Sequence, residues 1–235
     1  MNNIIFIIET VTVFGLLSLT NKFFKRDGVI AWVAIATILA NIITAKNATI
    51  FGMDTAIGTV MFASTFLATD ILSECYGKKY AKKAVMLGLF SSAVLIIATQ
   101  IALLYKPSAF DYADSPMRTL FGLNLRISIS SMIMYVIANL GDIFIFDKIK
   151  DKTGGKAMWL RNNVATILCN CLENFGFIGL AFWGIYDIKT IINIAVSTSV
   201  IEMAAALIDT PFLYLNRKIT KGEKNGEREE FIKRQ

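Results

Sequence analysis

Seven long apolar segments follow one another along this chain and leave little sequence between them. They cover residues 4–20, 29–45, 56–74, 84–105, 119–146, 158–184 and 189–215. An α-helix rises about 1.5 Å per residue, so each segment is near or above the roughly 20 residues that cross a bilayer. With 55% hydrophobic residues and a mean hydropathy of +0.56, the 235-residue chain lies outside the usual composition of soluble proteins. The sequence predicts an all-α polytopic membrane helix bundle with about seven transmembrane helices.

The lysines and arginines collect in alternate connections. Nineteen of the 24, counting Arg161 at the start of the sixth segment with the connection before it, lie between segments one and two, three and four, or five and six, or follow the last segment. Positive residues prefer the cytoplasmic side of a membrane protein, so we expect the amino terminus outside and the carboxyl terminus in the cytoplasm. This bias, together with anionic lipid, accounts for the net charge of +6, and we expect no nucleic-acid partner.

Several kinds of chemistry are excluded by what the chain lacks. It has no histidine, which removes zinc-protease helices, Ser–His pairs and most common metal sites. Residues 154–156 lack the remaining parts of a Walker phosphate loop, and residues 139–142 lack the first glycine of the intramembrane aspartyl protease pattern. We therefore predict no enzyme activity, no cofactor and no metal site.

Ionisable and amide side chains interrupt the apolar segments. Such groups are costly near the bilayer centre, so they usually face a cavity or a polar partner. Glu173 and Glu202 lie about midway through their segments and are the most informative. Residues three, four or seven apart share a helix face, which groups the polar residues into stripes. The candidate substrate-binding residues are Asp70, Arg126, Asp142, Asn170, Glu173, Asn174, Glu202 and Asp209, followed by Glu74 and Asn139.

Purely structural roles remain open for three of these residues. Glu74 stands four positions before Lys78, which is the spacing of an ion pair along a helix at the membrane boundary. Asp209 precedes a Thr-Pro pair and suits a break in the last helix. Asn139 has the chemistry of a hydrogen bond between two membrane helices.

Four stretches resemble, in order, the signature stretches of the queuosine precursor transporter family, also called vitamin-uptake-like transporters. They read FLATDILSECYGKKYAKKA, ANLGDIFIFDKIKDKTGGKAMWLRNNVAT, NCLENFGFIGLAFWG and ALIDTPFLYL. The resemblance covers roughly residues 30–218 and implies a bacterial inner-membrane importer of 7-cyano-7-deazaguanine, 7-aminomethyl-7-deazaguanine or queuine. It also implies an added helix and basic loop at 1–27, a six-helix core at 28–215 and a charged cytoplasmic tail at 216–235. The positions that match the family's motifs are Asp70, Arg126, Asp142, Asn170 and Asp209.

The chain departs from the family pattern at two places. The sixth segment has Glu173-Asn174 where Asp-Thr is usual, and the seventh has Glu202 near a usual lysine. The site then has a second carboxyl group, Glu202, where the family usually has a lysine ammonium. This favours a cationic substrate or a coupled proton.

The edge of a deazaguanine fits these residue types. Its ring N–H and amino group are adjacent donors that one carboxylate, of Glu173 or Asp70, accepts together. Asn170 and Asn174 match the remaining polar atoms, and Glu202 matches an aminomethyl cation. The expected partners are a small nucleobase-like substrate and the lipid bilayer. The oligomeric state stays open, as do a substrate-binding subunit that depends on a separate ATPase complex and a transporter for another small heterocycle or vitamin.

Overall fold

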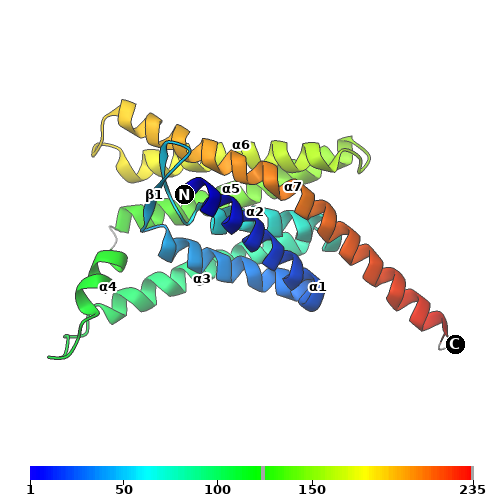
Figure 1. The fold of residues 1–235 in the computed structure, drawn as a ribbon, viewed down its shortest axis with the longest axis horizontal. Coiled ribbons are helices and arrows are strands. Elements are labelled where there is room, and N and C mark those ends of the chain that lie inside the picture. The colour runs from blue at the N-terminus through cyan, green and yellow to red at the C-terminus, as the bar shows by residue number, and fades with distance from the viewer. Residues whose placement is uncertain (123–124, 234–235) are drawn as a thin grey trace.

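The computed structural model of the chain is a helix bundle with one small β-hairpin (Figure 1). It describes residues 1–122 and 125–233, and the side chains of residues 125, 126, 128 and 223–233 lie outside the described part. Five helices among the described residues are long and apolar enough to cross a membrane, which confirms an all-α multi-pass bundle. The elements are α1 (Asn2–Ile43), β1 (Asn47–Ile50), β2 (Met53–Ala56), α2 (Thr59–Ile71), the π-helical turn η1 (Leu72–Tyr76), α3 (Lys78–Ala102), α4 (Asp114–Phe121), α5 (Leu125–Lys152), α6 (Met158–Phe182) and α7 (Ile188–Lys233).

Helix α1 holds the first two predicted segments, folded back on each other at Lys25. This residue has φ 53° and ψ −143°, which are not helical angles. The Asn2 amide donates to the Thr49 carbonyl at 3.0 Å, and the Asn3 side chain accepts from the Phe51 N–H at 2.8 Å. The start of the chain therefore lies beside the residues that follow the second half of α1, and the two halves run antiparallel (Figure 1).

The third segment forms the centre of the bundle as α2 and η1. Twelve of the 13 residues of α2 are buried, Asp70 among them. The helix widens at η1, where the Gly77 N–H bonds the Leu72 carbonyl five residues earlier at 2.7 Å. Gly77 then turns the chain with φ 107°, a value that glycine adopts readily. Because α3 begins at Lys78, the lysines expected in a connection form its first turns.

The short elements at one end of the bundle differ from the prediction. Strands β1 and β2 pair antiparallel around Phe51 and Gly52, both with positive φ as a type I′ turn requires. The third segment consequently becomes helical at Thr59, three residues later than expected. The fifth segment is divided, since α4 is a separate short helix and α5 begins at Leu125.

At the other end, α7 continues through the segment predicted as a charged tail from residue 216 and ends at Lys233. Asn216 is fully buried, and its Oδ1 accepts a hydrogen bond from Asn21 Nδ2 of α1 at 2.9 Å. The Tyr76 hydroxyl of η1 donates to the Asn21 Oδ1 at 2.8 Å, so one asparagine joins three elements. The sequence did not indicate this extension of the helix because its residues are mostly charged. The helix continues because the first turns of the extension pack against the fold-back of α1 at Lys25.

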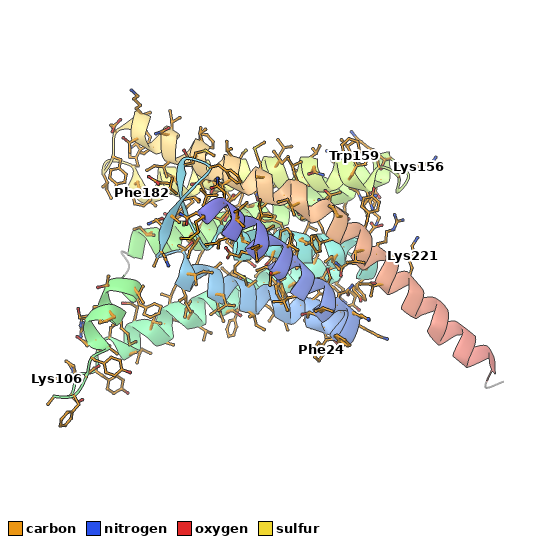
Figure 2. All side chains as sticks on the ribbon, in the orientation of Figure 1. Phe24, Lys106, Lys156, Trp159, Phe182 and Lys221 are labelled. Atoms are coloured by element: carbon orange, nitrogen blue, oxygen red, sulfur yellow. The ribbon has the colours of Figure 1, made fainter. Side chains whose placement is uncertain are left out.

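The outer faces of the long helices carry large apolar side chains, as expected for contact with lipid. Phe90, Leu168 and Leu207 are each more than half exposed. Trp159 lies at the end of the bundle near Lys156, and Phe182 lies at the opposite end of α6 (Figure 2). Trp159 is 56% exposed, and an indole in that place suits the interface between lipid and water.

Candidate functional site

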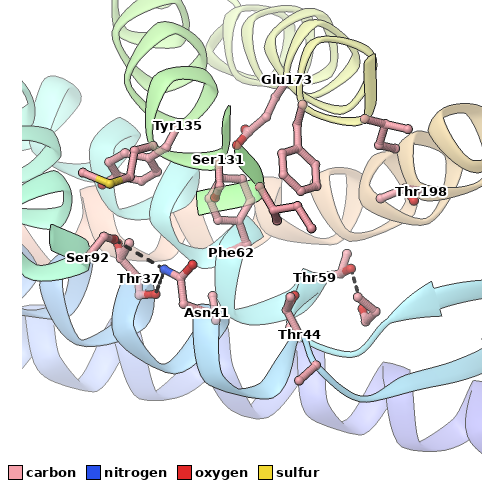
Figure 3. Close-up of a pocket in the computed structure, with 18 of the residues that line it drawn as sticks. Thr37, Asn41, Thr44, Thr59, Phe62, Ser92, Ser131, Tyr135, Glu173 and Thr198 are labelled. Atoms are coloured by element: carbon pink, nitrogen blue, oxygen red, sulfur yellow. Dashed lines mark hydrogen bonds between the residues drawn. The ribbon is translucent and has the colours of Figure 1, made fainter. Parts of the chain in front are cut away.

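The bundle encloses a cavity of about 470 Å³, within the range of small-molecule sites. It is lined by α1, α2, α3, α5, α6 and α7 (Figure 3). The hairpin contributes Asp54 and α4 contributes Phe121, so one end of the cavity reaches the end of the bundle that carries these elements. Three of the predicted site residues line it, namely Glu173, Asn174 and Glu202.

These three residues make the cavity acidic. Glu202 Oε2 accepts a hydrogen bond from Asn174 Nδ2 at 2.6 Å, and the same amide lies 3.3 Å from Ser199 Oγ. Glu173 is 9% exposed, and its Oε2 has no hydrogen-bond partner among the described residues. None of the described lining residues is a lysine or arginine. The cavity therefore offers an unused buried acceptor beside a second carboxyl group, which suits a ligand with N–H donors or a positive charge.

Aromatic side chains form part of the wall. Phe62 of α2 and Tyr135 of α5 meet edge to face with ring centroids 6.1 Å apart (Figure 3). Tyr135 fits because α3 has Gly88 opposite it, where a Cβ would overlap the phenol hydroxyl. A flat heterocycle finds stacking surface here next to the carboxyl groups.

A second group of predicted residues is buried deeper and does not line the cavity. We refer to Asp70, Asp142 and Asp209 as the acid layer, and none of them is more than 1% exposed. Asp142 Oδ1 accepts from Thr166 Oγ1 at 3.2 Å, and Asp209 Oδ1 accepts from Asn162 Nδ2 at 2.6 Å. The carboxyl groups of Asp70 and Asp142 adjoin each other.

Helix geometry separates the two groups by about two turns. On α5, Asp142 follows Tyr135 by seven residues, and on α7, Asp209 follows Glu202 by seven, which is about 11 Å along each axis. Phe66 packs between the levels with Ala138 and Cys169, in a small apolar cluster. The sequence predicted one polar site, whereas the structure divides its residues into a pocket and an acid layer.

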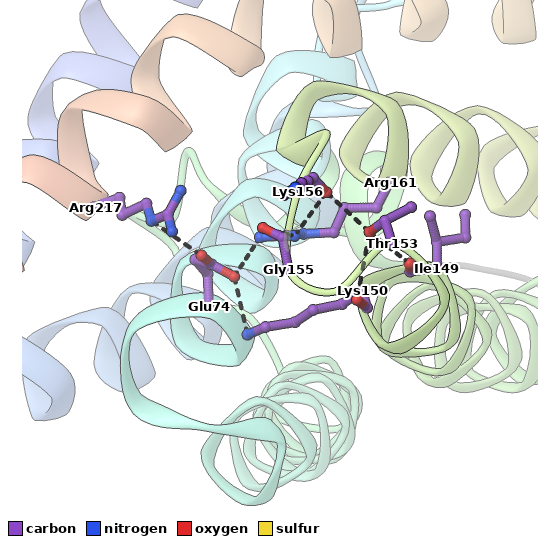
Figure 4. Close-up of polar contacts among 8 residues, drawn as sticks. All are labelled: Glu74, Ile149, Lys150, Thr153, Gly155, Lys156, Arg161 and Arg217. Carbon is purple, nitrogen blue, oxygen red and sulfur yellow. Dashed lines mark hydrogen bonds and ion pairs between the residues drawn. The ribbon is translucent and has the colours of Figure 1, made fainter.

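Glu74 belongs to a third level, the Glu74 cluster, which it forms with Lys150, Arg161 and Arg217 (Figure 4). Its side chain is 5% exposed, and its oxygens lie 2.5 Å from Arg161, 2.9 Å from Lys150 and 3.1 Å from Arg217. One carboxylate thus connects η1 with α5, α6 and α7. The suggested ion pair with Lys78 is wrong, because Lys78 pairs with Asp147 at 3.2 Å.

Arg161 is the buried charged residue of this cluster that the sequence did not single out as a candidate. It was counted among the basic residues of a connection, yet it is fully buried in α6 and also donates to the Gly155 carbonyl at 3.1 Å. Its position inside the apolar segment 158–184 was the available signal.

The remaining candidates have separate places. Asn139 donates to the Tyr135 carbonyl of its own helix at 3.0 Å, and its Oδ1 has no partner among the described residues. Asn170 is buried, and neither of its side-chain polar atoms has a described partner. Arg126 belongs to α5, but its side chain lies outside the described residues.

The helix that carries Glu202 begins at a charged cap. Asp187 precedes α7 and accepts hydrogen bonds from the Thr190 hydroxyl at 2.6 Å and the Thr190 N–H at 3.1 Å. These bonds hold the pKa of the exposed Asp187 carboxyl below its usual value. The cap satisfies a free N–H of the first turn of α7.

Comparison with known proteins places the chain in a family. A sequence model described as "Putative vitamin uptake transporter" matches residues 56–216, more than half of the chain. The chain belongs to this family. The vitamin uptake transporter match runs from the end of β2 into α7, and it therefore includes the acid layer, Glu173 and Glu202 of the pocket, and the Glu74 cluster except Arg217. The resemblance inferred from four sequence stretches is confirmed.

Two relatives support the same family. The "Probable queuosine precursor transporter" of Bacillus subtilis (strain 168) is 31% identical over 93% of this chain and 96% of its own length. A protein with the same description from Haemophilus influenzae (strain ATCC 51907 / DSM 11121 / KW20 / Rd) is 28% identical over 57% of this chain and 54% of its own length. No solved structure matches the chain. The family and the apolar helices identify a multi-pass membrane transporter.

Proposed function

We propose that this protein imports 7-deazaguanine precursors of queuosine across the bacterial inner membrane. The names of its two relatives point to this class of substrate. The observation that carries the proposal is the pair of buried carboxyl groups in the cavity, Glu173 with an unused oxygen and Glu202 beside it.

Glu173 recognises the guanine-like edge in this proposal. The ring N–H and the exocyclic amino group are adjacent donors, and one carboxylate accepts both in parallel. The free Oε2 supplies an acceptor that no described protein group uses. The rings of Phe62 and Tyr135 provide apolar surface for the heterocycle.

Glu202 distinguishes between the precursors. It lies near Glu173, and the described lining contains no cation to balance the two acids. The aminomethyl group of 7-aminomethyl-7-deazaguanine carries a positive charge, whereas the nitrile of the cyano precursor does not. We expect the amine to bind more tightly than 7-cyano-7-deazaguanine and guanine in a thermal-shift or binding panel that also includes queuine.

The uptake test uses cells that lack their native importer. Labelled 7-aminomethyl-7-deazaguanine should accumulate in cells that carry the wild-type protein. Its uptake should be at least tenfold lower with Glu173→Gln. Asp114→Asn in the exposed helix α4 is the matched control and should transport normally. Full uptake by Glu173→Gln would contradict the role of Glu173 at the guanine-like edge. Uptake by the purified chain alone in vesicles would also exclude dependence on a separate ATPase complex.

The proposal includes an orientation, with the amino terminus outside and the carboxyl terminus in the cytoplasm. The cavity then reaches the outside past the hairpin and α4, and the Glu74 cluster closes the cytoplasmic end. A variant without native cysteines tests this by single replacements of Tyr112, which is 92% exposed, and Lys221. An impermeant maleimide should label intact cells only at position 112, and the reverse result would invert the topology.

The position of the cavity supports the proposed division of the chain. Its lining residues run from Thr37 to Glu202, inside the six-helix core assigned to 28–215. The added segment 1–27 contributes no described lining residue. The region 216–235 begins at the buried Asn216 and extends α7 past the Glu74 cluster.

A further inference from the structure

The acid layer contains more carboxyl oxygens than hydrogen-bond donors. Thr166 supplies one donor to Asp142, and Asn162 supplies one to Asp209. Both oxygens of Asp70 and the second oxygen of Asp142 receive no hydrogen bond from described residues. A carboxylate without donors is costly to bury, so the acid layer needs a further donor.

Contact between two carboxyl groups requires a proton. Ionised carboxylates only accept hydrogen bonds, and two of them side by side repel each other. When one carries a proton, its O–H donates to the other, and the pair becomes a favourable contact. Asp70 and Asp142 adjoin in this way, on α2 and α5. The ligand that completes the layer is therefore a single proton held between two oxygens.

The surroundings of the pair are otherwise poor in charge. The groups that face it are Asp209 on α7, and Arg161 and Cys169 on α6. The buried residues of α1 and α3 include no charged side chain. No group of acidic, cysteine or histidine side chains among the described residues has the arrangement of a metal site. A proton needs only the two adjoining carboxyl oxygens, whereas a bound metal cation needs several ligands.

The position of the pair is the second part of the argument. It lies about 11 Å along the helices from the cavity, beyond the packed Phe66, and on the side of the Glu74 cluster. Residues at such a place are shielded from the cavity, but they share α2 and α5 with it. A change in protonation there acts on the same helices that hold the substrate.

We propose that the Asp70–Asp142 pair binds one proton, and that this proton crosses the membrane inward together with the substrate. The second half rests on the proposed import of a deazaguanine, whereas the first half does not. No bond other than O–H is made or broken. The proton enters from the side of the cavity and leaves from the side of the Glu74 cluster.

Infrared spectroscopy tests proton binding without any substrate. The purified protein in vesicles at pH 7 should show the C=O stretch of a protonated buried carboxyl group, and part of this band should be lost in Asp70→Asn and in Asp142→Asn. Asp114→Asn, on the exposed helix α4, should leave the band unchanged. An unaltered band in both layer variants would overturn the proton site. An unchanged unfolding transition in an SDS titration followed by tryptophan fluorescence shows that the variants are folded.

Vesicles loaded with the pH dye pyranine test the coupling. Adding 7-aminomethyl-7-deazaguanine outside should acidify wild-type vesicles, and an inward proton gradient should drive its accumulation. Asp70→Asn should lower both signals at least tenfold while keeping exchange of labelled for unlabelled substrate. Substrate accumulation that depends on a sodium gradient, or that does not depend on the pH gradient, would refute proton coupling. Failure of the wild-type protein to bind any precursor would refute the proposed function and leave the infrared result standing.

Discussion

Replacing Glu74 by glutamine should destabilise the protein more than any other single change in the Glu74 cluster. The substitution keeps the shape of the side chain and removes its charge. Three cations then remain around a neutral amide, and one of them, Arg161, is fully buried. An arginine cannot release its proton to avoid the cost, so the buried charge is left without a counterion.

The size of the effect follows from the burial of each partner. Removing one partner of a buried ion pair typically costs about 3–5 kcal/mol of unfolding free energy. The side chains of Lys150 and Arg217 are 31% and 34% exposed, so water screens them. Each of these two contacts contributes less than about 1 kcal/mol. We therefore expect Glu74→Gln to cost about 3–5 kcal/mol, nearly all of it from Arg161.

The converse substitution, Arg161→Met, should cost less. Glu74 keeps Lys150 and Arg217 as counterions, and the main loss is the buried hydrogen bond to Gly155, for a total of roughly 1–3 kcal/mol. Combining both substitutions removes the stranded charge, so the double variant should be more stable than the sum of the two by about 1–3 kcal/mol.

The assay is unfolding in mixed detergent micelles, followed by tryptophan fluorescence across an SDS titration. Lys78→Met is the control at the same end of the bundle, because its pair with Asp147 is partly exposed and should contribute about 1 kcal/mol or less. Equal costs for Glu74→Gln and Arg161→Met, with simple additivity in the double variant, would refute this reasoning.

Three further predictions concern other parts of the bundle. Gly88→Ala should push the Tyr135 hydroxyl aside, cost about 1–3 kcal/mol in the same titration and weaken binding of the aminomethyl precursor, whereas Gly179→Ala, which has open space, should not. Asn21→Leu should lower the unfolding free energy by about 1–3 kcal/mol, because it strands buried polar partners on η1 and α7. Because the pKa of Asp187 is lowered in the folded state, its cap stabilises the folded protein above the unfolded pKa of about 4, and this stabilisation is lost as the pH falls further. Asp187→Ala should therefore make the melting temperature depend less steeply on pH in the acid range.

The course of the chain through the bundle was largely predictable from its apolar segments. Hydrophobic length determines where a helix crosses a membrane, and the basic residues near Lys25 marked the fold-back inside α1. The hairpin and α4 escaped prediction because elements of four to eight residues leave almost no periodic signal. The extension of α7 escaped because Asn216 is buried by a partner nearly 200 positions away, which local sequence does not reveal.

The site was predictable in its residue types and not in its grouping. A carboxyl group inside an apolar segment is conspicuous, so Glu173, Glu202 and Asp70 were all found from the sequence. Which acid meets which partner depends on the packing of helices that are distant in the chain. The sequence therefore suggested Lys78, the lysine nearest to Glu74 along the chain, as its partner. The partner nearest in space is Arg161, which lies 87 positions away in the sequence.

Arg161 connects the Glu74 cluster to the acid layer, and this links the two main predictions. It is paired with Glu74, and it also exerts a favourable electrostatic interaction on ionised Asp70. When Glu74 loses its charge, the buried guanidinium gains most by pairing with another carboxylate, and Asp70 can supply one by releasing the shared proton. Glu74→Gln should consequently weaken the protonated-carboxyl infrared band at pH 7, although residue 74 is not part of the pair. An unchanged band in that variant would show that the two levels act independently.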